Sequence, residues 1–410
     1  MKKMYVAVMV ATWVMGTASA SRADSVGDLQ KQLDDLRGRV QELQKQKKAD
    51  DQGDKDGYFK KVWGATRLSG YGELDYIFRR DNGNGKGGNT LDPHRVVLNV
   101  TSELSDWITF NSELEWEHGG SDGQDGGVAV EQAYLDFKVR PAVNVRAGVM
   151  LMPLGAINQN HEPVNFYSTA RPALDTYIIP STWQEMGIGL HGAPHKIVDY
   201  QIMAVTGLDG SKFDATSGLR EGRPSFGQDS NRNFAVTGRL DVRPVAGLTT
   251  SVSFYAGNSA PSGAPTAYTT LLAFDGKYRY KDFEIAGEYA HVYQDKPGVL
   301  SPEIGRTMSG YWFEGAWHAM PESLKKGRLS NADAVLFARW SELNTQASGV
   351  ADPAKVSGRF DRNYLTVGLS FLPIPSVAVK ADYQIYNDHR SAGELPLDND
   401  KFQLTLGFVF

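Results

Sequence analysis

The last ten residues of the chain, KFQLTLGFVF (residues 401–410), carry the pattern that decides the fold. In an extended strand every second side chain points to the same face. Here one face is wholly apolar and ends in an aromatic residue, which is typical of a strand that contacts lipid in a membrane barrel. The residues of this face are Phe402, Leu404, Leu406, Phe408 and Phe410.

Period-two alternation continues upstream from this strand. It is clearest in WITFNSELEWEH (residues 107–118), where apolar side chains alternate with threonine, asparagine and glutamate. A soluble sheet with one wet face would share this pattern. About sixteen segments carry it, an even number, and no helical block interrupts them, so the sheet must close or expose an edge. The segments are 67–78, 92–102, 107–118, 128–140, 143–152, 185–192, 197–206, 233–243, 248–257, 267–280, 283–293, 309–319, 330–342, 360–372, 376–387 and 400–410.

The connections between these segments alternate in length. Connections after odd-numbered segments are long and polar, as in DNGNGKGGNTLD (residues 81–92), whereas most others are short and several contain proline. Residues 320–328 are an exception, because they are long for a turn. Short turns at one end and long loops at the other are typical of outer-membrane barrels. We therefore expect an all-β fold, a transmembrane antiparallel β-barrel of about 16 strands.

The first 57 residues predict two other segments. Residues 1–20 combine Lys2 and Lys3, an apolar stretch and a small-residue end at Ala20, which indicates a secretory signal peptide. Residues 21–57 hold a short coiled-coil helix, which favours association, and a polar linker. A solvated helical spacer is the alternative. The barrel would then occupy residues 58–410. The apolar seam of the helix is Val26, Leu29, Leu33, Leu36, Val40 and Leu43.

Composition excludes several kinds of function. The chain has no cysteine, which excludes disulfides, thiolate metal sites and covalent haem attachment. Its formal charge of −5 becomes −7 when Lys2 and Lys3 are removed, and this argues against nucleic acid as a partner. The glycine motif at 83–88 leads into a strand and not a helix, and His191 and His195 flank a predicted turn. We therefore expect no enzyme, no cofactor and no metal.

Acidic side chains gather on one face of the 107–118 segment. In a barrel they point into the lumen, where they attract cations, or else they form a hydrated wall with no selective role. Basic side chains on neighbouring segments are placed to offset them. The predicted lumen-facing residues are Arg95, Glu113, Glu115, Glu117, Lys138 and Arg146.

The longest connection, residues 152–185, is too rich in apolar and aromatic residues to remain disordered. It must pack against something, and in a wide barrel the inner wall is the available surface. We therefore expect a constriction loop at about 153–184.

This region also carries a family resemblance. The phrases GVMLMPLG (148–155), HEPVNFY (161–167), RPALD (171–175) and IIPSTW (178–183) resemble bacterial outer-membrane porins of the phosphate-selective O and P group. The resemblance implies a trimeric sixteen-stranded barrel with a constriction loop. It does not carry over phosphate selectivity, because the sequence has no basic surplus. On this interpretation the candidates at the constriction are Asn158, His161, Glu162, Arg171, Asp175 and Glu185.

These six residues have an alternative, structural role. They would pin the loop to the wall through hydrogen bonds and ion pairs, which we favour for Glu162 and Arg171 because buried charges need partners.

The expected function is a water-filled channel for passive diffusion of small hydrophilic solutes or ions across the outer membrane of a Gram-negative bacterium. The alternative is a barrel sheath around a periplasmic cytochrome, in an electron conduit. The expected partners are outer-membrane lipid, two further copies in a homotrimer, and the barrel-assembly machinery, which would read the C-terminal strand ending at Phe410.

Overall fold

The computed structural model describes residues 38–39, 65–120, 126–223 and 233–410. The expected signal peptide lies outside the described residues, and so does the coiled-coil segment apart from residues 38–39. The chain divides into two units, Met1–Gly64 and Ala65–Phe410, and the second unit contains every described strand. Among the described residues, no helix has the length and apolar character needed to cross a membrane.

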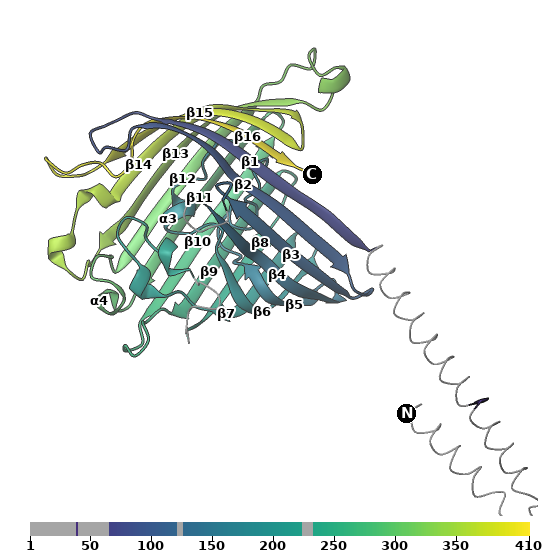
Figure 1. The fold of residues 1–410 in the computed structure, drawn as a ribbon, viewed down its shortest axis with the longest axis horizontal. Coiled ribbons are helices and arrows are strands. Elements are labelled where there is room, and N and C mark those ends of the chain that lie inside the picture. The colour runs from purple at the N-terminus through teal and green to yellow at the C-terminus, as the bar shows by residue number, and fades with distance from the viewer. Residues whose placement is uncertain (1–37, 40–64, 121–125, 224–232) are drawn as a thin grey trace, which may run out of the picture. The chain divides into compact units, whose positions relative to one another are not determined.

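The second unit is a closed antiparallel barrel in which each strand pairs with its sequence neighbours (Figure 1). Strand β16 pairs with β1, from Tyr71 opposite Val409 to Arg79 opposite Lys401, and this pairing closes the sheet. The predicted all-β barrel of 16 strands is confirmed. The strands are β1 (Thr66–Arg79), β2 (Gly88–Glu103), β3 (Ile108–Glu117), β4 (Gly127–Arg140), β5 (Val143–Leu151), β6 (Gln184–His195), β7 (Val198–Thr206), β8 (Phe234–Val242), β9 (Leu248–Asn258), β10 (Tyr268–Tyr280), β11 (Phe283–Gln294), β12 (Thr307–His318), β13 (Asp333–Ser348), β14 (Asp361–Ile374), β15 (Val377–Asp388) and β16 (Lys401–Val409).

The period-two pattern sorts side chains to the two faces of this barrel. On β1, Leu68 and Phe78 point outward and are 67% and 46% exposed, whereas Tyr71, Glu73 and Asp75 point inward and are buried. The apolar residues of β16 also form part of the outer surface. An apolar outer belt is what a sheet in contact with lipid requires.

Connection lengths alternate around the barrel. Turns of two residues join β4 to β5, β6 to β7, β10 to β11 and β14 to β15. The expected exception, between β12 and β13, contains the 3₁₀ helix η3 (Gly327–Leu329). The longer connections carry the remaining short helices: α3 (Leu174–Tyr177), α4 (Pro297–Leu300), η1 (Gly210–Lys212), η2 (Arg220–Gly222), η4 (Pro353–Lys355) and η5 (Gly358–Phe360).

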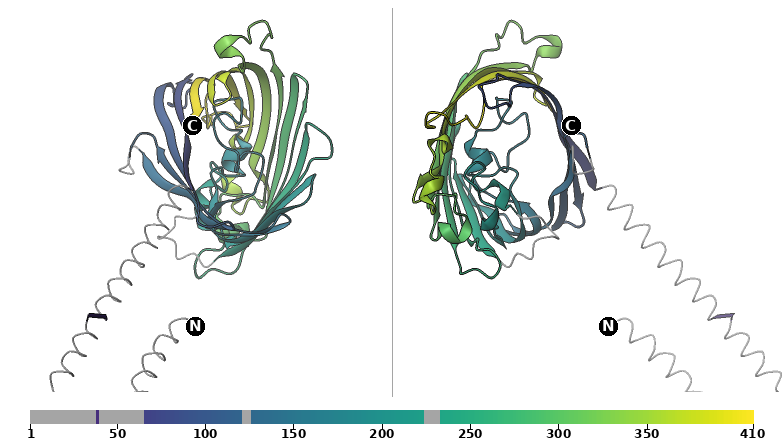
Figure 2. Two further views of the ribbon diagram at one scale, coloured as in Figure 1. Left: turned by 90° about the vertical axis from the view of Figure 1, so that its right-hand side faces the viewer. Right: turned by 60° about the vertical axis from the view of Figure 1, so that its left-hand side comes forward.

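The connection between β5 and β6, residues 152–183, folds into the barrel, as does part of the connection between β7 and β8 (Figure 2). Their apolar side chains, including Leu154, Ile179, Trp183 and Leu219, are buried against inward-facing residues of β5 and of β7 to β15. No described residue of β1 to β4 or β16 is among the buried members of this apolar cluster. The loops therefore pack against one side of the lumen. We call residues 152–183 the inner loop.

Candidate functional site

Asn158 closes the base of the inner loop. Its side-chain amide donates hydrogen bonds to the backbone oxygens of Met152 (2.8 Å) and Trp183 (3.0 Å), and its Oδ1 accepts one from the Trp183 N–H (2.8 Å). Asn158 is fully buried. These bonds join the two ends of the loop, so Asn158 shapes the loop and does not face solute.

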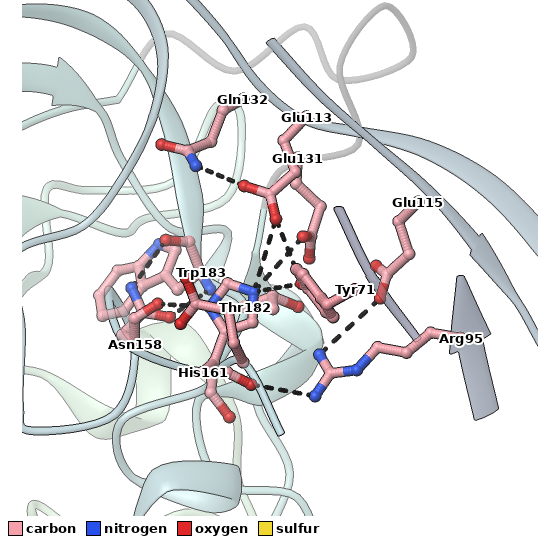
Figure 3. Close-up of polar contacts among 12 residues, drawn as sticks. Tyr71, Arg95, Glu113, Glu115, Glu131, Gln132, Asn158, His161, Thr182 and Trp183 are labelled. Atoms are coloured by element: carbon pink, nitrogen blue, oxygen red, sulfur yellow. Dashed lines mark hydrogen bonds and ion pairs between the residues drawn. The ribbon is translucent and has the colours of Figure 1, made fainter. Parts of the chain in front are cut away.

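His161 fixes the loop to the wall formed by β1 to β4 (Figure 3). Its Nε2 lies 2.8 Å from the Tyr71 hydroxyl, 3.5 Å from Glu131 and 3.9 Å from Glu113. Arg95 donates a hydrogen bond of 3.1 Å to the His161 backbone oxygen. All five residues are buried, so the imidazole and the carboxylates meet away from bulk water.

The other side of the loop is held by β13 and β15. Arg339 donates hydrogen bonds to Ser168 Oγ (2.7 Å) and to the Ala170 backbone oxygen (3.0 Å). Lys380 donates to the Ser168 backbone oxygen (2.9 Å), and Asp382 accepts a bond of 2.5 Å from the Thr169 N–H. Charged wall residues thus satisfy backbone groups that would otherwise be buried unpaired.

Asp175 is fully buried, on helix α3. It accepts a hydrogen bond of 3.0 Å from Trp312 Nε1, which also donates to Glu288 at 3.3 Å. Glu288 in turn accepts from the Ala156 N–H at 3.1 Å. Asp175 therefore lies against β11 and β12.

Glu185, a predicted constriction residue, is part of the wall and not of the loop, in the strand expected at 185–192. It is the second residue of β6 and is fully buried. It accepts hydrogen bonds from Trp183 Nε1 (2.8 Å) and from Thr206 Oγ1 (2.5 Å). The tryptophan holds the end of the loop against the start of the strand.

Glu162 and Arg171 do not pin the loop as expected. Glu162 accepts a hydrogen bond of 2.6 Å from Asn165, within the loop itself. Arg171 forms no ion pair with a described residue, and its Nη2 is buried without a hydrogen-bond partner among them. Burial lowers the pKa of Arg171 to about 10, so the guanidinium is still protonated at neutral pH.

The predicted lumen-facing residues take different positions. Glu113, Glu115 and Arg95 point inward but are covered by the inner loop, with 5%, 3% and 2% exposure. Glu117 is exposed at the end of β3. Lys138, near the end of β4, is also exposed, whereas Arg146 is ion-paired to Asp136 at 2.8 Å.

A cavity of about 340 Å³ separates the inner loop from the wall of β1, β2 and β16. We call it the wall cavity. It shares lining residues Arg79 and Lys401 with a second cavity of about 460 Å³, and it shares Arg220 with a third of about 240 Å³. The three residues that the wall cavity shares with its neighbours are therefore all cationic. The charged and imidazole residues of the wall cavity are Glu73, Arg79, Asp75, Asp92, His94, Arg95, His118, Arg171, Arg220 and Lys401.

Several residues that line the cavities or hold the inner loop were not identified from the sequence. Arg220 and Arg223 lie in the connection between β7 and β8, and they donate hydrogen bonds to the Ser181 backbone oxygen at 3.1 and 3.2 Å. No motif marks this connection as one that folds into the lumen. Arg339 and Lys380 sit at polar positions of alternating strands, so period two predicts that they face inward but not what they hold.

Comparison with known proteins places these features in a family. The model of the phosphate-selective porin O and P family matches residues 68–383. An uncharacterised protein of Aquifex aeolicus (strain VF5) is 29% identical over 363 residues, which are 84% of this chain and 79% of that protein.

Three solved structures share the fold at low sequence identity. They are the outer-membrane channel DcaP of Acinetobacter baumannii (TM-score 0.58, 12% identity, 84% of this chain and 97% of that one), the anion-selective porin of Comamonas acidovorans (0.54, 12%, 84% and 99%) and the trimer form of OmpT of Vibrio cholerae (0.53, 10%, 84% and 99%).

Proposed function

This chain belongs to the phosphate-selective porin O and P family, and we propose from that premise that its channel passes small hydrophilic anions. As a porin it forms an outer-membrane channel for passive diffusion. Such a channel selects among solutes through the side chains at its narrow parts. The proposal therefore concerns the charges beside the inner loop.

Arg171 is the observation that carries the proposal. Its guanidinium lines the wall cavity and forms no ion pair with a described residue. Its Nη2 is buried without an acceptor among the described residues, so the positive charge is not offset by a hydrogen-bonded partner there. Since the guanidinium lines the cavity, it attracts a passing anion, and guanidinium groups match carboxylate and phosphate oxygens well.

The neighbouring charges support the same sign. Arg220, Arg79 and Lys401 line the same cavity, and Arg220 donates a hydrogen bond to a backbone oxygen. Glu73, by contrast, is neutralised by Arg95 at 2.8 Å. An acidic chain can still present a cationic path, because selectivity follows the charges beside the path and not the net charge.

The filled lumen argues against the sheath around a cytochrome. The inner loop and residues 207–223 already pack inside the barrel, against β5 and β7 to β15. A protein partner in the lumen would have to displace this apolar core, with the loss of its burial free energy. The family and the fold are also those of a channel.

The oligomeric state, the membrane and the two ends of the chain are further parts of this proposal. We propose a homotrimer in a Gram-negative outer membrane, supported by the family and by the trimer form of the similar barrel from Vibrio cholerae. The C-terminal strand ending at Phe410 would present its apolar face to the barrel-assembly machinery. The proposal also includes a signal peptide at residues 1–20 and a coiled-coil segment within residues 21–57.

Reversal potentials test the proposed selectivity. The purified protein is inserted into a planar bilayer that separates two KCl solutions differing tenfold in concentration. An anion-selective channel gives a reversal potential near the equilibrium potential of chloride. A reversal potential at zero or on the potassium side would refute the proposed preference.

A further inference from the structure

Glu131 is a buried carboxylate that accepts no hydrogen bond from a described residue. It lies on β4, is 1% exposed, and neither of its side-chain oxygens has a hydrogen-bond partner among the described residues. The imidazole of His161 is nearby, at 3.5 Å. Burying a charge without a hydrogen-bonded partner is unfavourable by several kcal/mol, so this arrangement calls for a further positive group.

Glu131 forms no ion pair with an arginine or lysine among the described residues, because Arg220 and Arg223 line the same cavity but donate to a backbone oxygen. Glu113 and Glu115 are buried beside it on β3. Arg95 lies 3.9 Å from Glu115 but pairs more closely with Glu73, at 2.8 Å. At ion-pair distance, the three glutamates share the imidazole of His161 and part of one guanidinium among the described residues. One divalent cation would remove this imbalance.

We propose that Glu113, Glu131 and His161 bind a divalent transition-metal ion of the zinc class. Each offers one ligand atom, and these atoms all lie within 4.8 Å of one another. Around tetrahedral zinc, with bonds of about 2.0 Å, neighbouring ligand atoms are about 3.3 Å apart. The distances from His161 Nε2 are 3.5 Å to Glu131 and 3.9 Å to Glu113 (Figure 3). Only small side-chain movements are needed to reach coordination geometry.

The groups around the three ligands fix them as metal sites require. His161 Nδ1 lies 2.9 Å from the Asn158 backbone oxygen and donates to it, which leaves Nε2 free to bind a metal. Glu113 accepts hydrogen bonds from Gln132 (2.5 Å) and Tyr71 (3.1 Å). With a metal bound, Tyr71 keeps Glu113 as its acceptor and gives up its contact with His161. One imidazole and two carboxylates suit zinc better than the larger calcium ion.

The position of the three ligands determines how an ion reaches them and what its binding changes. Glu131 lines the cavity of about 240 Å³, in which four glutamates outnumber Arg220 and Arg223, so a cation in this cavity reaches the carboxylate without unfolding the wall. His161 belongs to the inner loop, whereas Glu113 and Glu131 belong to β3 and β4. A bound ion therefore joins the loop to the wall, so the stability of the folded channel depends on the metal. This role is separate from the conduction of solutes.

Zinc content tests the site directly. Asp92, His94 and His118 form a second group of possible metal ligands. The H118A variant removes one of these three ligands and serves as the reference protein, so that zinc bound at the second group does not obscure the result. The folded H118A barrel is stripped with EDTA, incubated with zinc sulfate, desalted and measured by mass spectrometry for zinc. We expect one zinc per chain, and a loss of tenfold or more in H118A with E131Q added. E113Q serves as a second variant if E131Q does not fold.

The thermal stability of the same proteins gives an independent measurement. Zinc is expected to raise the melting temperature of H118A and to leave that of H118A/E131Q unchanged. Two results would overturn the site: a folded H118A barrel that holds no zinc, or E131Q protein that holds as much as its parent. In the first case, a proton shared among the three glutamates would account for their burial. Neither result depends on whether the channel prefers anions.

Discussion

Lys380 on β15 donates a hydrogen bond of 2.9 Å to the backbone oxygen of Ser168 in the inner loop. On the other side of the loop, His161 contacts Tyr71 on β1 at 2.8 Å. In the closed sheet only β16 lies between β15 and β1, so these two contacts fix the loop to one sector of the wall, on either side of the wall cavity. This double attachment keeps the wall cavity at a defined size, because the loop cannot move away from this sector without losing buried polar contacts.

Replacing Arg171 with glutamine should reduce the anion preference, and R171E should reduce it further or reverse it. The guanidinium lines the wall cavity, so its loss removes the positive potential that attracts anions. K326Q is the control, because Lys326 is an exposed residue of the β12–β13 connection and its loss changes the net charge equally. The measurement is the reversal potential in a KCl gradient. Equal shifts in R171Q and K326Q would exclude a local role for Arg171.

Replacing Arg339 with methionine should destabilise the barrel by about 3–5 kcal/mol. The substitution removes two hydrogen bonds to the inner loop and leaves Glu314, 3.5 Å away and buried, without its cation. The double variant R339M/E314Q should lose less, because no unpaired charge remains. Urea unfolding followed by tryptophan fluorescence measures both. A double variant that is as unstable as R339M would show that the loop contacts, and not the orphaned charge, dominate.

The strands on either side of β1 predict different costs for two glycines. A Cβ on Gly70 would lie 2.2 Å from the Val97 backbone oxygen, whereas one on Gly72 would lie 2.5 Å from the ring end of Phe408. A ring can turn away, but a paired backbone cannot. G70A should therefore lower the folded fraction more than G72A, as measured by heat-modifiable mobility on gels. The reverse order would mean that the Phe408 ring is fixed and that the backbone at Val97 yields more easily.

The outer belt predicts a depth-dependent cost for charge. Val367, in the middle of β14, is 43% exposed on the outer face, and V367R should cost about 2–4 kcal/mol in lipid. Val245 is 58% exposed in the connection between β8 and β9, so V245R should cost little. Unfolding in lipid vesicles compares the two. Equal costs would mean that Val367 does not face hydrocarbon.

Much of the fold follows from local sequence, because period two acts within a single strand. Leu68 and Phe78 on β1 alternate with Glu73 and Asp75, and this alternation alone predicts which side chains face lipid. The aromatic residue at the chain end and the alternating connection lengths together predict closure. These signals need no knowledge of distant contacts.

The site is less predictable because it depends on what the loops cover. Glu113 and Glu115 face the lumen as period two predicts, yet the inner loop buries them, and their expected role as solvated charges does not follow. Arg171 was expected to have a paired charge, but Glu162 bonds within the loop. Arg220 enters the wall cavity from a different connection. Such contacts join distant parts of the chain, and no local pattern encodes them.

Passive diffusion through this barrel requires an open, water-filled path beside the inner loop. Single-channel recording of the folded protein in a planar bilayer detects such a path. The structure predicts discrete, long-lived conductance steps that carry more chloride than potassium. A preparation whose heat-modifiable mobility shows that it is folded, but which never conducts, would contradict an open path.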